Sequence, residues 1–130
     1  MGKPDLSITV FGKKIDMPIF LSPTAMQRLY HHDGDKASAK AAEKFGTFYS
    51  MSTMANNTIE EIAEISKGPK LFQLYVHKDQ SITDDLIERC KVSGYDGMCL
   101  TVDTLVAGNR ERDHRTGFTT PPKLTLQSLM

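Results

Sequence analysis

One pattern constrains the fold more than any other: a short apolar run followed by a helical segment, repeated along the chain. The apolar runs occupy residues 18–22, 47–52, 70–76 and 97–102. Their short length and flanking Gly or Pro residues favour strands over helices. They begin 29, 23 and 27 residues apart, close to the period of a strand–helix–strand unit. The alternation predicts an α/β protein with a parallel sheet.

The segments between these runs carry helix signals at their ends. Residues 33–45 are rich in alanine and stop at Gly46, which favours a left-handed helix end. Asn57 followed by Glu60 fits a capping box that begins a second helix.

The third helix shows the clearest pattern. We expect a cap at Ser81, an end at Gly94, and one apolar face made of Ile82, Leu86, Ile87 and Cys90.

The chain is too short for a complete barrel of such units. A parallel sheet is either an open doubly wound layer or a closed (β/α)8 TIM barrel, and eight units need about 200 to 250 residues. We expect residues 1–130 to form one partial domain with four βα units. A short hairpin turning at Gly12 and Lys13 precedes them, placed to plug one end of a barrel, and residues 108–130 are predicted to be loop.

Charge and hydropathy exclude several classes of protein. Sixteen basic and sixteen acidic side chains give a net charge of zero, which disfavours nucleic acid and anionic membrane surfaces as partners. No segment approaches the ~20 apolar residues of a membrane span. The start of the chain lacks a basic-then-apolar signal pattern, so we expect a cytoplasmic location.

Cysteine and histidine patterns give no metal or redox site. Cys90 and Cys99 have apolar neighbours and are expected to be reduced packing residues. The run His31, His32 and Asp33 has no second ligand cluster at metal spacing, so we interpret it as a loop or helix entry. The chain has no glycine-rich nucleotide loop and no CxxC pair.

Polar residues at the strand ends point to function, because parallel α/β proteins place their sites there. Gln73, Tyr75 and His77 alternate with apolar residues and therefore share one face of a strand, which we expect to point inward. Unpaired polar groups there cost ~1 to 3 kcal/mol each. Either a polar ligand pairs with them, or they bond one another or buried water.

Asp103 closes the fourth run and precedes several arginines, namely Arg110, Arg112 and Arg115. A buried acid could orient a catalytic base while an arginine holds an anionic substrate. A structural Asp–Arg bridge explains the same pattern equally well.

Four stretches resemble, in order and spacing, the first four βα units of the FMN-dependent 2-hydroxy-acid dehydrogenases and oxidases, a family that includes glycolate oxidase and flavin L-lactate dehydrogenase. They are PIFLSPTAM, GTFYSMSTMANNTIEEIA, KLFQLYVHKD and GYDGMCLTVDTLVAGNRERD. The likeness covers about residues 5–129. It implies half of an FMN-binding barrel whose parent enzyme oxidises a 2-hydroxy acid, lactate or glycolate, to the 2-oxo acid.

The resemblance also assigns roles by position. Residues similar to those that meet the flavin near N5 through the backbone are Pro23, Thr24 and Ala25, and residues similar to those that bond the isoalloxazine are Ser52, Gln73 and Thr101. Tyr75 resembles the tyrosine that bonds the substrate, Asp103 the aspartate paired with the catalytic histidine, and Arg110 an arginine beside the substrate.

The family's catalytic histidine, its flavin-binding lysine and its phosphate loops belong to later strands, so the resemblance implies that this chain alone is inactive. Expected partners are the small hydroxy acid, the missing C-terminal half of the barrel and a second copy in a homo-oligomer, because half a barrel exposes two strand edges. A further expected partner of the parent enzyme is a membrane surface, through peripheral association. Two alternatives are a phosphate-binding barrel isomerase or aldolase fragment and a non-catalytic half-barrel assembly module.

Overall fold

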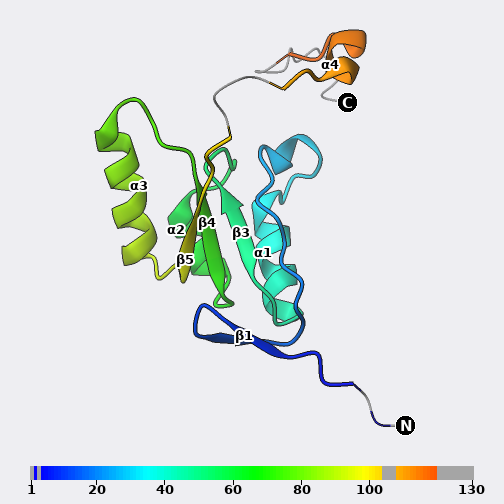
Figure 1. Cartoon of the computed structure of the whole chain (residues 1–130), viewed down its shortest axis with the longest axis vertical. Coiled ribbons are helices and arrows are strands. Elements are labelled where there is room, and N and C mark those ends of the chain that lie inside the picture. Colours follow the sequence, from blue (N-terminus) through cyan, green and yellow to red (C-terminus); the bar gives the residue numbers. More distant parts are fainter. Residues whose placement is uncertain (1, 3, 104–107, 120–130) are drawn as a thin grey trace.

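The computed structural model describes residue 2, residues 4–103 and residues 108–119. Strands and helices alternate along the chain (Figure 1). The elements are β1 Ile8–Val10, β2 Lys13–Ile15, the 3-10 helix η1 Gln27–Leu29, α1 Asp35–Lys44, β3 Tyr49–Ser52, α2 Ile59–Ile65, β4 Lys70–Leu74, α3 Gln80–Val92, β5 Gly97–Leu100 and α4 Glu111–Thr116. This order confirms the predicted α/β class.

Three of the predicted strands form a parallel sheet in the order β3-β4-β5. The first predicted strand, residues 18–22, is instead an extended segment with a single parallel bridge from Leu21 to Tyr49. Pro18 and Pro23 flank this segment and cannot donate to a ladder, which keeps the pairing short. Within the described residues the parallel sheet therefore has three regular strands and one bridging segment, not four complete strands.

Helices α1, α2 and α3 cover the same face of the sheet (Figure 1). Their apolar residues pack against alternate residues of β3 and β4 in a core of Ala39, Ala42, Tyr49, Met51, Ile59, Ile62, Phe72, Leu74 and Cys90. Because side chains alternate along a strand, Ser52 and Gln73 lie on the opposite face. This arrangement, helices outside and the other face inward, is that of a barrel segment.

The N-terminal segment forms the predicted hairpin, which lies at the amino ends of the strands (Figure 1). Ile15 of β2 packs there against Phe48 and Leu71 and closes that end of the sheet. The turn is one residue earlier than expected, at Phe11 and Gly12, whose φ values are 49° and 72°. Two left-handed residues in succession match the twist of a tight hairpin.

Helix α2 begins one residue later than the sequence predicted. The capping box joins Thr58 and Glu61, with the Glu61 N–H donating to Thr58 Oγ1 at 3.2 Å and the Thr58 N–H donating to Glu61 Oε2 at 2.9 Å. Asn57 precedes the cap. This register buries Ile59 and Ile62 in the core, so packing decides between two overlapping capping patterns.

Helix α3 begins earlier than predicted, with Asp79 as its cap in place of Ser81. Asp79 Oδ1 accepts from the Ser81 N–H at 3.0 Å, a role in which carboxylates are favoured. The inward face includes Thr83, which is buried, whereas the predicted core residue Ile82 is exposed. Gly94 ends the helix region in a left-handed conformation, as expected.

A short helix occupies part of the segment predicted to be loop. Helix α4 carries an Arg115–Glu111 ion pair of 3.6 Å and ends at Gly117, which has φ 68°. Acidic residues in its first turn and basic residues in its last turn suit the helix dipole. Residues 120–130 of the predicted loop lie outside the described residues.

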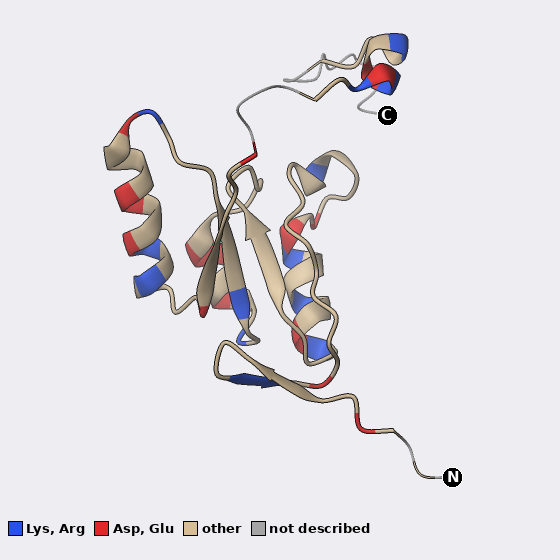
Figure 2. Cartoon of the chain, viewed as in Figure 1, with Lys and Arg blue, Asp and Glu red and all other residues tan. Residues whose placement is uncertain are grey.

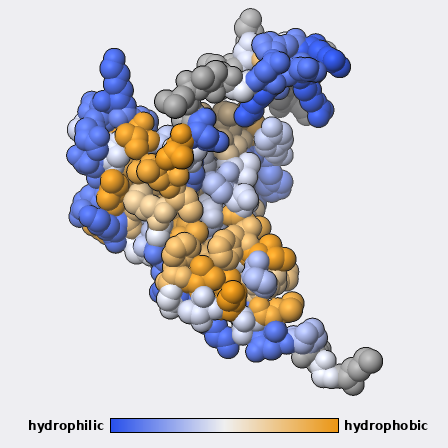
Figure 3. Space-filling view, viewed as in Figure 1, coloured by the Kyte–Doolittle hydropathy of each residue, from blue (hydrophilic) through white to orange (hydrophobic). Residues whose placement is uncertain are grey.

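The outer edge of β5 is the open side of the described sheet. Exposed apolar residues there are Met98 and Leu100 of β5 and Val102 just after it, and Figure 3 shows hydrophobic surface on the face where β5 lies. Cys99 is exposed there, contrary to the prediction that it packs, while Cys90 is buried; both thiols are free. In the described part of the chain, no helix combines the length and apolar character needed to cross a bilayer.

Candidate functional site

A cavity of about 440 Å³ opens at the carboxyl ends of the strands. Small-molecule sites usually measure about 300 to 1,000 Å³. The cavity brings together eight of the nine predicted site residues, from the segment after residue 22, the three strand ends and the segment before α4: Pro23, Thr24, Ala25, Ser52, Gln73, Tyr75, Thr101 and Arg110.

Gln73 is the centre of the polar cavity wall and is only 5% exposed. Its Nε2 donates to Thr101 Oγ1 at 2.8 Å, and its Oε1 accepts from Ser52 Oγ at 3.3 Å and from the Thr53 N–H at 3.2 Å. The three predicted isoalloxazine contacts therefore bond one another across β3, β4 and the end of β5. They form what we call the strand-end cluster: Ser52, Gln73 and Thr101.

The strand-end cluster is electrically neutral. Each of its hydroxyl and amide groups can both donate and accept. Such a wall suits a neutral heterocycle that carries carbonyl oxygens and N–H groups along one edge. The donor set therefore fits the pyrimidine edge of an isoalloxazine better than it fits a phosphate, which would need cations or several free N–H groups.

Thr53 fixes the end of β4, a role that the sequence did not reveal. Its hydroxyl donates to the Gln73 carbonyl and accepts from the Tyr75 N–H at 3.1 Å. Tyr75 is half-buried and lines the cavity. His77 does not join it, because β4 ends at Leu74 and the exposed His77 instead donates its N–H to Thr83 Oγ1 at 3.0 Å.

The turn after residue 22 is held against the loop that follows β3. The Met26 N–H donates to the Met54 carbonyl at 3.1 Å, and both residues line the cavity. Met26 has φ 53°, a left-handed conformation that costs a residue with a Cβ roughly 1 to 2 kcal/mol. Backbone strain of this kind persists where surrounding contacts over-determine it.

The structure does not place Asp103 as predicted. Asp103 is exposed and lies outside the cavity lining, and it forms no ion pair within the described residues. Arg110 does line the cavity, but its side chain is 80% exposed and lies 4.0 Å from Asp113. Of the two interpretations of Asp103, the structural bridge to an arginine does not form within the described residues, because no described segment covers the end of β5. The role of Asp103 beside a catalytic base stays a prediction.

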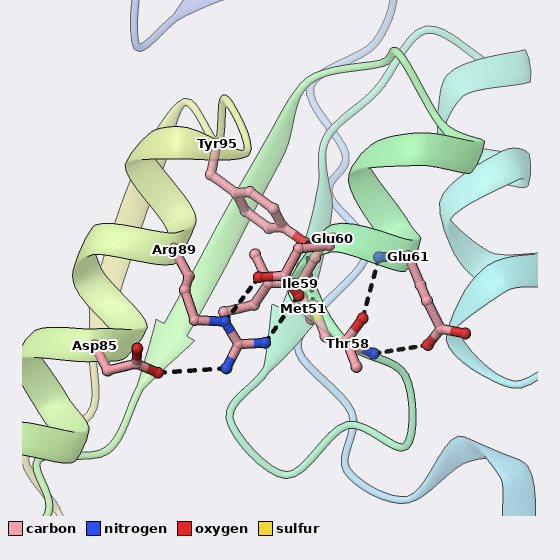
Figure 4. A network of polar contacts seen from close by, with 8 residues as sticks. All are labelled: Met51, Thr58, Ile59, Glu60, Glu61, Asp85, Arg89 and Tyr95. Carbon is pink, nitrogen blue, oxygen red and sulfur yellow. Dashed lines mark hydrogen bonds and ion pairs between the residues drawn. The ribbon is translucent and has the colours of Figure 1, made fainter.

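Charged groups lie mainly on the helices and the hairpin (Figure 2). A charged network of Glu60, Asp85 and Arg89, which we call the α2–α3 network, joins α2 to α3 (Figure 4): Arg89 donates to Glu60 at 2.7 and 2.8 Å and to Asp85 at 3.4 Å. The hydrogen bond from Arg89 lowers the pKa of Glu60 to about 2. These contacts connect the two helices, since Glu60 belongs to α2 and both Asp85 and Arg89 belong to α3.

The fold and the site together define a portion of a (β/α) barrel enzyme with a polar cavity at its strand ends. The sequence profile of the FMN-dependent dehydrogenases matches residues 1–130. The chain belongs to this family, whose members depend on FMN.

Relatives and solved structures agree with that family. The chain is 43% identical to glycolate oxidase 1 of Oryza sativa over 98% of its length and 35% of the relative's. It is also 43% identical to an L-lactate oxidase of Nostoc, covering 96% of this chain and 35% of the relative.

Among solved structures, a lactate oxidase of Pediococcus acidilactici superposes with a TM-score of 0.87 at 33% identity, over 98% of this chain and 35% of that one. A soluble mutant of the membrane-associated (S)-mandelate dehydrogenase of Pseudomonas putida superposes with a TM-score of 0.84 at 37% identity. The match covers 96% of this chain and 36% of that one. The chain thus spans about a third of the length of these proteins.

Proposed function

We propose that this chain forms the flavin-facing first part of an FMN-dependent oxidoreductase that oxidises an L-2-hydroxy acid, lactate or glycolate, to the 2-oxo acid. The observation that carries the proposal is the single cavity lined by eight of the nine residues that the resemblance assigns to the site. Relatives named glycolate oxidase and L-lactate oxidase support this substrate class. They favour it over a phosphate-binding isomerase or aldolase.

The strand-end cluster would hold the isoalloxazine of FMN, which supplies the hydride acceptor when it is bound. Gln73 can offer its amide while Ser52 and Thr101 rotate their hydroxyls toward the ligand. Residues 23–25 line the same cavity, and the resemblance implies that their backbone would meet the flavin near N5. In this proposal these groups orient the flavin and set the polarity around it.

Tyr75 and Arg110 would act on the substrate. The Tyr75 hydroxyl can donate a hydrogen bond to the substrate hydroxyl or carboxylate, since the residue lines the same cavity as Gln73. Arg110 can hold the carboxylate through two parallel N–H bonds, and its exposed side chain is free to turn inward. Asp103 would orient and stabilise a protonated histidine contributed from outside these 130 residues.

The proposed partner of this chain is the complementary part of the barrel. In the described sheet β5 is an edge strand, and the exposed apolar side chains beside that edge include Leu100 at 58% and Val102, just after the strand, at 77%. Such an edge favours pairing with another strand, from the complementary part or from a second copy in a homo-oligomer. We expect the chain by itself to be inactive.

A cytosolic location is part of the proposal, in keeping with two free thiols. For the parent enzyme, a peripheral membrane association is a second option, because one structural neighbour is a monotopic membrane (S)-mandelate dehydrogenase.

A chimera tests the proposed function. Residues 1–130 would replace the matching segment of a lactate oxidase relative, with the unaltered relative as control. We expect a yellow protein that converts lactate or glycolate to the 2-oxo acid. A folded, colourless chimera that turns over neither acid would contradict the proposal.

A further inference from the structure

Beneath the cavity turn lies a buried carboxylate that the proposed function does not use. Asp35 is the first residue of α1, and it is 0% exposed. Among the described residues, no basic side chain forms an ion pair with it. A buried carboxylate without a cation is costly unless hydrogen bonds satisfy its oxygens. Its partners should therefore show why the position holds an acid.

Three donors from three segments meet at this carboxylate. Asp35 Oδ1 accepts from Tyr49 Oη at 2.8 Å and from Gln27 Nε2 at 3.2 Å, and Oδ2 accepts from the Asn56 N–H at 3.2 Å. Burial, followed by the negative charge of Asp35, raises the pKa of Tyr49 above its ordinary range, so the phenol keeps its proton and donates. The carboxylate thus ties β3, η1 and the loop after β3 to the start of α1.

Two of these donors connect directly to the cavity segments. Gln27 Nε2 also lies 3.4 Å from the carbonyl of Thr24, to which it donates. Asn56 Oδ1 accepts from the Arg28 N–H at 3.0 Å, which joins the two loops a second time. The contacts of Asp35 therefore reach the turn of residues 23–25 from one side and the loop of residues 53–56 from the other.

We propose that Asp35 is a positioning residue that fixes the turn of residues 23–25 against the loop of residues 53–56. Its relevance to flavin rests on the proposed function, whereas the coupling of the two loops is a property of this chain alone. A carboxylate suits this role because it only accepts, and so can take three donors at once. An amide of the same shape keeps one acceptor oxygen and turns a donor toward the Asn56 N–H.

The test is amide hydrogen exchange, measured by NMR on the 130-residue chain without flavin, for Asp35→Asn against the unaltered protein. We expect exchange at the Met26 and Arg28 amides to accelerate about tenfold, the effect of losing one buried hydrogen bond. Amides of β4 should change less than about threefold, because local opening leaves the core closed. Asp84→Asn, at an exposed position on α3, is the matched control and should change neither group.

A uniform acceleration at all amides, β4 included, would show a general stabilising role and overturn the proposal; so would unchanged exchange at Met26 and Arg28. If Asp35→Asn does not fold, Gln27→Ala cuts the link to Thr24 and leaves the bond from Tyr49 in place. Relative to the unaltered protein, that variant should accelerate exchange at the Met26 amide more than at the Arg28 amide. An equal acceleration at the two amides would contradict the proposal. Because no flavin is added, these outcomes do not depend on whether the cavity binds flavin.

Discussion

The strand-end cluster and the α2–α3 network are both polar, but the first consists of neutral groups and the second of charged ones. In the α2–α3 network, charges of opposite sign face each other, and Arg89 contacts both Glu60 and Asp85 (Figure 4). In the strand-end cluster, neutral groups bond one another and also line a cavity of about 440 Å³. In the α2–α3 network the charged groups are paired with one another, whereas the strand-end cluster has hydroxyl and amide groups that can also bond a ligand in the cavity.

A structural polar network and a binding one can be distinguished by where they lie in the fold. Perturbed pKa values often mark functional sites, yet the lowered pKa of Glu60 belongs to a pair that joins two helices. The strand-end cluster contains no ionisable side chain. In this chain, location at the strand ends is a better guide to function than charge.

The largest expected effect is at Gln73. Replacing it with Leu removes the partners of Thr101 Oγ1, Ser52 Oγ and the Thr53 N–H. Each unsatisfied buried group costs about 1 to 3 kcal/mol, and partial access of water at the cavity should limit the total to roughly 3 kcal/mol. Urea unfolding measures the change, with Gln80→Leu on the exposed start of α3 as control. A loss below that of the control would show that the cluster does not hold the strand ends together.

A smaller effect is expected at Tyr95, which lies beside the α2–α3 network. Its hydroxyl donates to the Ile59 carbonyl at 3.2 Å and lies 3.1 Å from Met51 Sδ, so Tyr95→Phe should cost about 1 kcal/mol at neutral pH.

The pH dependence of Tyr95 follows from its burial, which raises its pKa above the ordinary value. Below pH ~10 both states keep the proton, and stability is full; above it the unfolded chain ionises first, so the free energy of unfolding falls. Tyr95→Phe should flatten part of this alkaline decline, leaving the part due to Tyr49. An identical decline in the variant would contradict the assignment.

The smallest effect is expected at Glu60. Its side chain is half exposed, so the pair with Arg89 should contribute only about 0.5 kcal/mol, less at high salt. Because the folded pKa is lowered from 4.5 to about 2, this contribution is present above pH 4.5 and lost as the pH falls toward 2. Glu60→Gln should reduce the acid sensitivity of unfolding, whereas Glu64→Gln, exposed on the same helix, should not. Equal acid profiles for the two variants would argue against the pair.

The sequence predicted those features that rest on local periodicity. The strand–helix alternation, the hairpin and the joint position of Gln73 and Tyr75 follow from spacing, because a parallel sheet brings its carboxyl ends to one edge. The capping register of α2 could not be read the same way, since Asn57 and Thr58 both fit and only the burial of Ile62 separates them.

Features that depend on residues far apart in the chain could not be predicted from the sequence pattern. Asp103 follows an apolar run, which predicts burial, but burial requires a covering element and none of the described segments supplies one. Helix α4 shows the reverse case: the pair Glu111–Arg115 and the stop at Gly117 are local helix signals, but they stand in a polar segment whose overall composition favours loop. Asp35 gave no local signal, because its three donors come from separate segments.

We propose that flavin binds at the strand-end cluster and not elsewhere on this chain. The direct measurement is NMR of this chain, isotope-labelled, joined with an unlabelled complementary barrel part and titrated with FMN. We predict that the amide shifts concentrate at Ala25, Ser52, Gln73 and Thr101, while amides of the α2–α3 network stay in place. Shifts centred on α2 and α3, or flavin bound with no shift at the strand ends, would contradict the account.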